Sequence, residues 1–250
     1  MSSWSVKRRL LYGLGFISII ALIGAGLFWQ IFYHRPTCSD NKQNGDETGI
    51  DCGGSCQKLC PSDILEPVVL WSKIFHISGD LYTAVAYVEN PNVNSKNAKA
   101  IYQFKIYNGD NKLITVKDGQ TDIPKNKKVA IFETGIVLKQ KPKRAELEFT
   151  YLSAWEKDNK NEPEISITHS ALLSASTTPS ITGMIINNSL EIISTIELDA
   201  FVEDNSENVI AASRTFIDGL SQGQSEDFVF TWPLPFNIMP SVVQVIYKVL

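Results

Sequence analysis

The chain has 250 residues, of which 44% are hydrophobic and 20% charged, and its formal net charge is −4. Every Asp and Glu lies beyond residue 33, where 27 acidic residues face 20 Lys and Arg, a net charge of −7. This acidic balance argues against a nucleic-acid footprint and against a polybasic lipid-binding surface.

Residues 10–33 form an uncharged apolar run, "LLYGLGFISIIALIGAGLFWQIFY", that follows the basic cluster of residues 7–9. At about 1.5 Å per residue its 24 residues span about 36 Å, enough to cross a hydrocarbon core of roughly 30 Å. Tyr12 and Trp29 suit the two interfaces, and the leading cations place residues 1–9 in the cytoplasm. The pattern predicts an uncleaved signal anchor with an extracytoplasmic body.

A cleaved signal peptide is the alternative interpretation of this run. Such a peptide usually has an apolar region of about 7–15 residues and small residues at its cleavage site. This run is longer and ends in the bulky stretch "FWQIFYHRP". The anchor interpretation is therefore favoured.

Residues 36–62 contain all four cysteines of the chain: Cys38, Cys52, Cys56 and Cys60. In an oxidising compartment, closely spaced cysteines indicate a disulfide framework. The segment has only Ile50 and Leu59 as large apolar residues, so it needs crosslinks to be ordered. Three pairings are compatible with four cysteines. Zinc is disfavoured by the C-x3-C-x3-C spacing, and a thiol-redox centre by the lack of C-x-x-C.

Calcium is a second interpretation of the same segment. Asp40, Asn44, Asp46 and Asp51 fall at positions one, five, seven and twelve of an EF-hand-like loop. Oxygen ligands around a glycine turn suit calcium. Lys42 at position three and the Asp at position twelve depart from that pattern, so a solvated acidic turn is the competing interpretation.

The stretch resembles an extracytoplasmic cysteine motif, C-x-D…N-G-x-E-x-G-x-D-C-G-G-x-C, of some bacterial surface proteins. The motif runs here from Cys38 to Cys56 and covers about a tenth of the chain. The resemblance implies a surface location and carries no activity.

The rest of the chain predicts an all-β fold, because apolar and polar residues alternate with period two. The first clear strand points one set of side chains inward: Ala98, Ala100, Tyr102, Phe104 and Ile106. A second strand has Ile196, Leu198, Ala200 and Val202 inward, with Glu197, Asp199 and Glu203 outward. Polar turn clusters separate such runs about every ten residues.

The chain also aligns with itself at an offset of about 97 residues, which places Asn90 on Asn187 and Ile106 on Val202. Two tandem Ig-like β-sandwiches are therefore predicted, at residues 65–156 and 164–250. The boundary falls in the polar stretch "WEKDNKNEPE".

"YVENPN" followed by "FKIYN" resembles the FxLYD-type sandwich, related to the late-embryogenesis-abundant water-stress domains. Phe104, Ile106 and Tyr107 stand at its motif positions, and Asn108 replaces its Asp. The second copy keeps only Val202 and Asp204. The resemblance implies a β-sandwich in envelope proteins and transfers no catalytic residue.

No catalytic motif emerges, and the three histidines, His34, His76 and His169, are far apart in the sequence. Asn187 begins a glycosylation sequon. Trp232 and Phe236, in "FTWPLPFNIMP", either form a ligand platform or plug one end of a sandwich, and the plug is favoured.

We therefore expect a non-enzymatic, single-pass cell-membrane protein whose extracytoplasmic sandwiches bind a partner or act as an envelope spacer. Its partner is expected to be another envelope protein or a surface polymer. An accessory subunit of an envelope enzyme and a calcium-dependent surface sensor are the alternatives. No cofactor is expected unless the acidic loop takes calcium.

Overall fold

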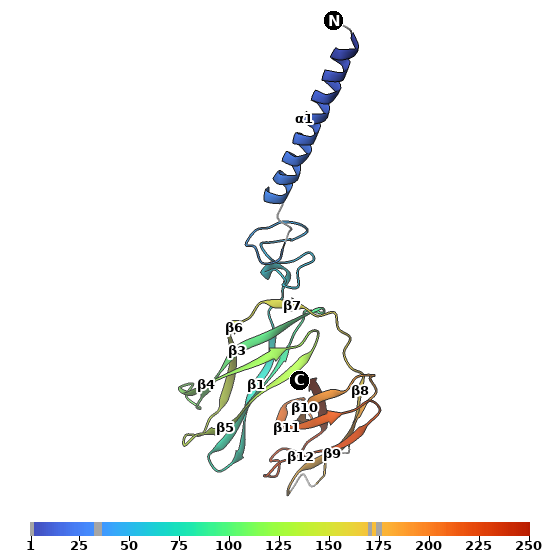
Figure 1. Cartoon of the computed structure of the whole chain (residues 1–250). Helices are drawn as coiled ribbons and strands as arrows, with labels where there is room; N and C mark the ends of the chain where they lie inside the picture. Colours follow the sequence, from blue (N-terminus) through green and yellow to red (C-terminus); the bar gives the residue numbers. More distant parts are fainter. Residues whose placement is uncertain (1–2, 33–36, 170–171, 174–176) are drawn as a thin grey trace. The chain divides into compact units, whose positions relative to one another are not determined.

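The computed structural model describes residues 3–32, 37–169, 172–173 and 177–250 (Figure 1). The chain divides into two compact units, Met1–Cys56 and Gln57–Leu250. The first contains one helix and most of the cysteine segment, and the second contains all the strands.

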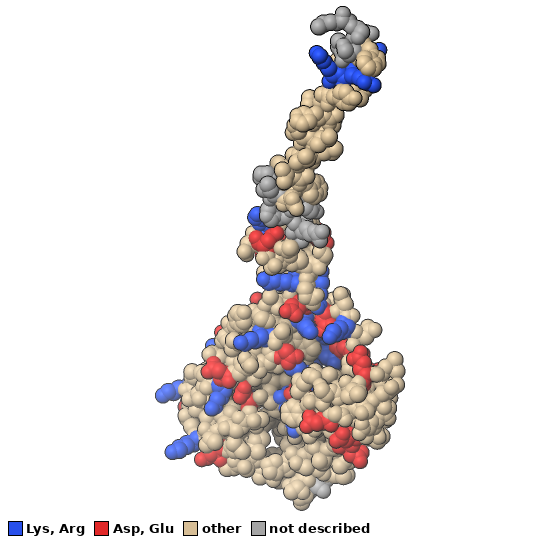
Figure 2. Space-filling view, in the orientation of Figure 1, with Lys and Arg blue, Asp and Glu red and all other residues tan. Residues whose placement is uncertain are grey.

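Helix α1 (Ser3–Phe32) begins before the predicted span and contains the basic cluster of residues 7–9. Within it, Lys7–Gln30 is long and apolar enough to cross a membrane, and none of it is buried in the protein. Length and composition of this kind are shared by membrane anchors and signal sequences. Figure 2 shows no charged side chain along the middle of this helix. Tyr33, His34 and Pro36 lie outside the described residues.

The first sandwich consists of two antiparallel sheets, with strand orders β1-β2-β5 and β4-β3-β6, and β7 joins the second of them beside β3. Its strands are β1 (Val68–Ser78), β2 (Leu81–Glu89), β3 (Ser95–Tyr107), β4 (Leu113–Ile123), β5 (Lys128–Val137), β6 (Arg144–Leu152) and β7 (Trp155–Lys157). A short 3-10 helix, η1 (Pro61–Asp63), precedes them.

The second sandwich repeats this strand order, with sheets β8-β9-β12 and β11-β10-β13. Its strands are β8 (Ile165–His169), β9 (Ser180–Asn187), β10 (Ile193–Glu203), β11 (Val209–Leu220), β12 (Ser225–Thr231) and β13 (Val242–Val249). The predicted all-β architecture after an apolar helix and a disulfide-rich segment is therefore confirmed.

Each sandwich has its own apolar core between its two sheets. Tyr102, Phe104 and Ile106 of β3 belong to the first core, and the four predicted inward residues of β10 belong to the second. Ala98 was predicted to point inward, but it is exposed, because the register of β3 against β4 shifts between Asn97 and Ala100. The bulge leaves Asn97 buried in its place.

A buried asparagine closes the same corner in both sandwiches. Asn90 follows β2, accepts a hydrogen bond from the backbone N–H of Asn92, and donates to two backbone carbonyls. Asn187 ends β9 and makes the equivalent three bonds, accepting from the N–H of Ser189. Neither side chain is available to solvent. The sequon asparagine, Asn187, is thus fully used inside the fold.

The two sandwiches pack together through the outer faces of two sheets, β1-β2-β5 and β11-β10-β13. Val85, Tyr87 and Ala130 of the first contact Phe201, Val209 and Ala212 of the second, with Trp71 and Phe75 at their edge. The rings of Trp71 and Tyr87 lie 5.0 Å and 5.1 Å from the ring of Phe201. These distances are those of stabilising edge-to-face aromatic pairs.

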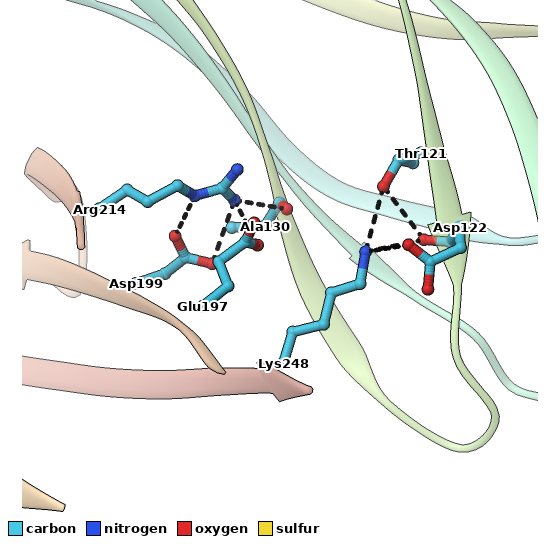
Figure 3. A network of polar contacts seen from close by, with 7 residues as sticks. All are labelled: Thr121, Asp122, Ala130, Glu197, Asp199, Arg214 and Lys248. Atoms are coloured by element: carbon cyan, nitrogen blue, oxygen red, sulfur yellow. Dashed lines mark hydrogen bonds and ion pairs between the residues drawn. The ribbon is translucent and has the colours of Figure 1, made fainter. Parts of the chain in front are cut away.

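Two charged residues of β10 that were predicted to point outward, Glu197 and Asp199, lie within this packed interface. They do point away from their own core, but the first sandwich covers them, so Asp199 is 1% and Glu197 7% exposed. Figure 3 shows Arg214 from β11 held by both carboxylates. It also donates to the backbone carbonyl of Ala130 in the first sandwich. The network satisfies charges that burial alone would make costly.

We expect Asn187→Ala to lower the free energy of unfolding by about 1–3 kcal/mol, because it leaves the buried carbonyl of Leu220, and the part-buried carbonyl of Glu191 and N–H of Ser189, without their partner. Asn188→Ala is the matched control, since Asn188 bonds the hydroxyl of Ser166 at the surface. Urea unfolding of the full chain measures both. Equal stability of the two variants would contradict the structural role of Asn187.

The interface should also make stability depend on pH. Burial raises the pKa of Glu197 to about 7, with Asp199 and Asp122 raising it further and Arg214 and Lys248 opposing. Because the folded state then holds a proton that the unfolded chain releases near its ordinary pKa of 4.5, stability contributed by this group falls as pH rises from 4.5 to 7.

Glu197→Gln removes this titration while keeping the shape of the side chain. The variant should gain stability relative to the wild type as pH rises across that window, and the gain should level off above pH 7. Urea midpoints at several pH values measure it, with the exposed Glu148→Gln as control. A difference that does not change with pH would count against a proton on buried Glu197.

Candidate binding cleft between the two sandwiches

The cysteine segment is crosslinked as a disulfide framework. Cys38 and Cys56 are bonded to each other, and Cys52 and Cys60 are also in disulfide linkage, so no cysteine is free. Gly53 and Gly54 have φ of 75° and 53°, and a Cβ on either would lie within 2 Å of a neighbouring atom. The D-C-G-G motif therefore supplies backbone turns that only glycine tolerates well.

The four residues predicted as calcium ligands form hydrogen bonds with other residues of the cysteine segment. Asp51 accepts from the backbone N–H of both Asp40 and Asn41, while Asp40 accepts from Lys42 and from the amide of Asn44. The bond from Asn44 holds the pKa of Asp40 below its ordinary value. Asp46 accepts from the hydroxyl of Ser55. These contacts fix turns without an ion, and calcium binding stays a prediction.

Asp51→Ala should loosen the segment in the absence of calcium, because bonds to a carboxylate contribute about 1.5–3 kcal/mol each. Hydrogen exchange at the amides of Asp40 and Asn41 should become roughly tenfold faster or more. Asp63→Ala, at an exposed residue of η1, is the control. Slower exchange of the wild-type segment in 1 mM calcium would support the calcium interpretation, and unchanged exchange would contradict it.

A cleft of about 700 Å³ lies where the two sandwiches meet. Residues 72–77 of β1 and residues 209–212 of β11 line it, and both strands stand at the edge of their sheets. The β12–β13 loop, residues 232–238, forms a further wall, and Lys143 and Arg144 stand at the start of β6. A volume of this size is typical of sites that take small molecules or short peptide segments.

The two aromatic residues that the sequence suggested for binding, Trp232 and Phe236, have different roles in the structure. Trp232 is 7% exposed, belongs to the second core, and donates its indole N–H to the carbonyl of Ala212. It therefore fills the end of the sandwich, although one side of it lines the cleft. Phe236 is half-buried, with its ring 5.4 Å from that of Trp232, and it lines the cleft as well. Further along the loop, Ile238 is 53% exposed.

Charged groups of the cleft take part in structural contacts. Lys73 donates to the backbone carbonyl of Val209, which ties β1 to β11, and burial lowers the pKa of its ammonium. Asp204 accepts backbone bonds from Asn208 and Ser206, which hold its pKa below the ordinary value. The hydroxyl of Ser72 is buried and has no hydrogen-bond partner in the described part of the chain.

Sequence reasoning missed this cleft because it forms between strands that are far apart in the chain. His76 is the one histidine that lines it, and its Nε2 lies 2.8 Å from the carbonyl oxygen of Gly79. His169 ends β8, and His34 lies outside the described residues. The apolar, proline-containing stretch "WPLPFNI" was the only local signal of a binding wall.

Comparison with known proteins adds little to this geometry. No family model and no curated protein matches the chain. Among solved structures it is similar to the crystal structure of red sea bream transglutaminase, with 9% identity and a TM-score of 0.26. The match covers 73% of this chain and 29% of that one, so this chain spans less than a third of that protein's length. Likeness at this level carries no argument, and the FxLYD and surface-protein resemblances rest on their motifs alone.

Proposed function

We propose that this chain is a non-enzymatic, membrane-anchored protein whose paired sandwiches bind an envelope partner in the cleft between them. Helix α1 supports the anchor, because its apolar stretch is entirely exposed in the folded chain and needs a nonaqueous environment. The disulfides support an oxidising, extracytoplasmic location for the segment that follows. The cations before the span support a cytoplasmic N-terminus.

The cleft is the observation that carries the binding role. Its walls combine an apolar loop, two strand edges and a few charged groups, which is the composition of a recognition site. Lys73 and Asp204, which line the cleft, are held by structural hydrogen bonds and are not paired with each other as nucleophile and base. The FxLYD-type resemblance, with its sandwich in envelope proteins, agrees with binding rather than catalysis.

Topology and capture in the native cells test the proposal. A tag after Leu250 should be accessible from outside the cell membrane, whereas a tag before Met1 should be protected. A photo-crosslinking amino acid at Ile238, which lines the cleft, should form a defined adduct with an envelope protein or polymer. The same amino acid at Val229, equally exposed on β12 but outside the cleft, is the control.

A protected C-terminal tag would overturn the extracytoplasmic location. Adducts of equal yield from both positions, or from neither, would overturn recognition through the cleft. Hydrolysis of envelope polymer by the purified chain would overturn the non-enzymatic role.

A further inference from the structure

We propose that the cleft binds an extended, acidic polypeptide segment, which adds as a strand to the free edge of β1. This proposal rests on the proposed binding function and names the class of its ligand. The mode is β-strand addition, in which main-chain hydrogen bonds supply affinity and side-chain contacts supply specificity.

The first observation is the free edge itself. In the described part of the chain, β2 is the only strand that pairs with β1. Its register against β2 shifts between Val69 and Trp71 and again between His76 and Ser78. Between the shifts, residues 71–76 form a regular stretch of about 20 Å, at roughly 3.3 Å per residue. An edge of this kind offers unpaired N–H and C=O groups to another chain.

The second observation is that the cleft follows this regular stretch. Residues 72–77 all line it, so a chain lying in the cleft runs along the edge of β1. The edge of β11 is less available, because Trp232 and Lys73 already bond its carbonyls at Ala212 and Val209. The opposite wall, residues 232–238, offers exposed apolar side chains, including Leu234 and Ile238, to alternate side chains of the added strand.

The third observation is charge. Lys73, Lys143 and Arg144 line the cleft against a single carboxylate, Asp204, although the chain as a whole is acidic. Arg144 forms an ion pair with Glu146, so exposed Lys143 is the cation best placed to bind an acidic ligand. This local excess of positive charge complements acidic side chains.

Two other occupants fit these observations less well. Two copies paired edge to edge through β1 would bring the cations of one cleft against those of the other. A polysaccharide lacks the regularly spaced amide groups that would pair with the main-chain N–H and C=O groups of β1. The indole of Trp232 is also buried, so it offers no flat surface on which a sugar ring could stack.

Labelled eight-residue peptides test the proposal, with the full-length chain held in detergent micelles. The probe alternates Asp and Val, and its analogue alternates Lys and Val. Two further versions of the acidic probe carry backbone N-methyl groups on odd or on even residues. Because only alternate residues of an added strand bond to its neighbour, one methylated version should bind at least tenfold more weakly than the other. The Lys-Val analogue should bind at least tenfold more weakly than the acidic probe.

Variants locate the binding. Lys143→Glu and Ile238→Asp should each weaken the acidic probe at least tenfold, whereas Lys141→Glu and Val229→Asp should not, since those exposed residues do not line the cleft. Equal affinity of the two methylated versions, absence of binding, or equal effects of cleft and control variants would overturn the proposal. A crosslinked partner at Ile238 in cells, without peptide binding, would overturn this inference and leave the proposed function standing.

Discussion

The architecture depends on one contact, the packing of the outer face of β1-β2-β5 against the outer face of β11-β10-β13. Phe201, whose ring packs against the rings of both Trp71 and Tyr87, supplies its apolar centre. Arg214 supplies a polar tie, because its guanidinium satisfies buried Asp199 and also reaches the carbonyl of Ala130 across the interface. This contact brings two edge strands, β1 and β11, side by side, and the cleft exists only while they remain so.

The contact is not symmetric, although the two sandwiches share one topology. The sheet β1-β2-β5 corresponds to β8-β9-β12, yet it packs on the sheet that corresponds to β4-β3-β6. In β3 the positions of Asp199 and Phe201 are taken by Gln103 and Lys105, and Gln103 bonds its cross-strand neighbour Asp118 instead of an arginine. The outer face of β3 is therefore polar at the two positions where β10 contributes Asp199 and Phe201 to the interface.

Sequence alternation was sufficient to find both cores, because a strand with one buried face repeats every two residues. It placed Glu197 and Asp199 on the outward face of their strand, but local sequence does not show what covers that face. A signal was present in "LYTAVAYV", whose Val85 and Tyr87 are apolar on the side away from the core, as in strands buried on both faces. The bond from Lys248 to Asp122 joins residues 126 apart and left no local trace. The cleft was hidden for the same reason.

The two sides of the interface are closed to different degrees, and this explains where the cleft opens. Beside β5 and β13, Lys248 bonds Thr121 and Asp122, and Lys127 lies 4.3 Å from the ring of Tyr247. The polar linker strengthens this side, since Asp158 and Glu162 pair with lysines of the β4–β5 loop. Beside β1 and β11, the bond from Lys73 to Val209 is the comparable tie across the interface. The chain connection and the ion pair of Lys248 with Asp122 therefore fix one edge. The opposite edge is left open along β1, which among the described strands pairs only with β2 and so can receive another strand.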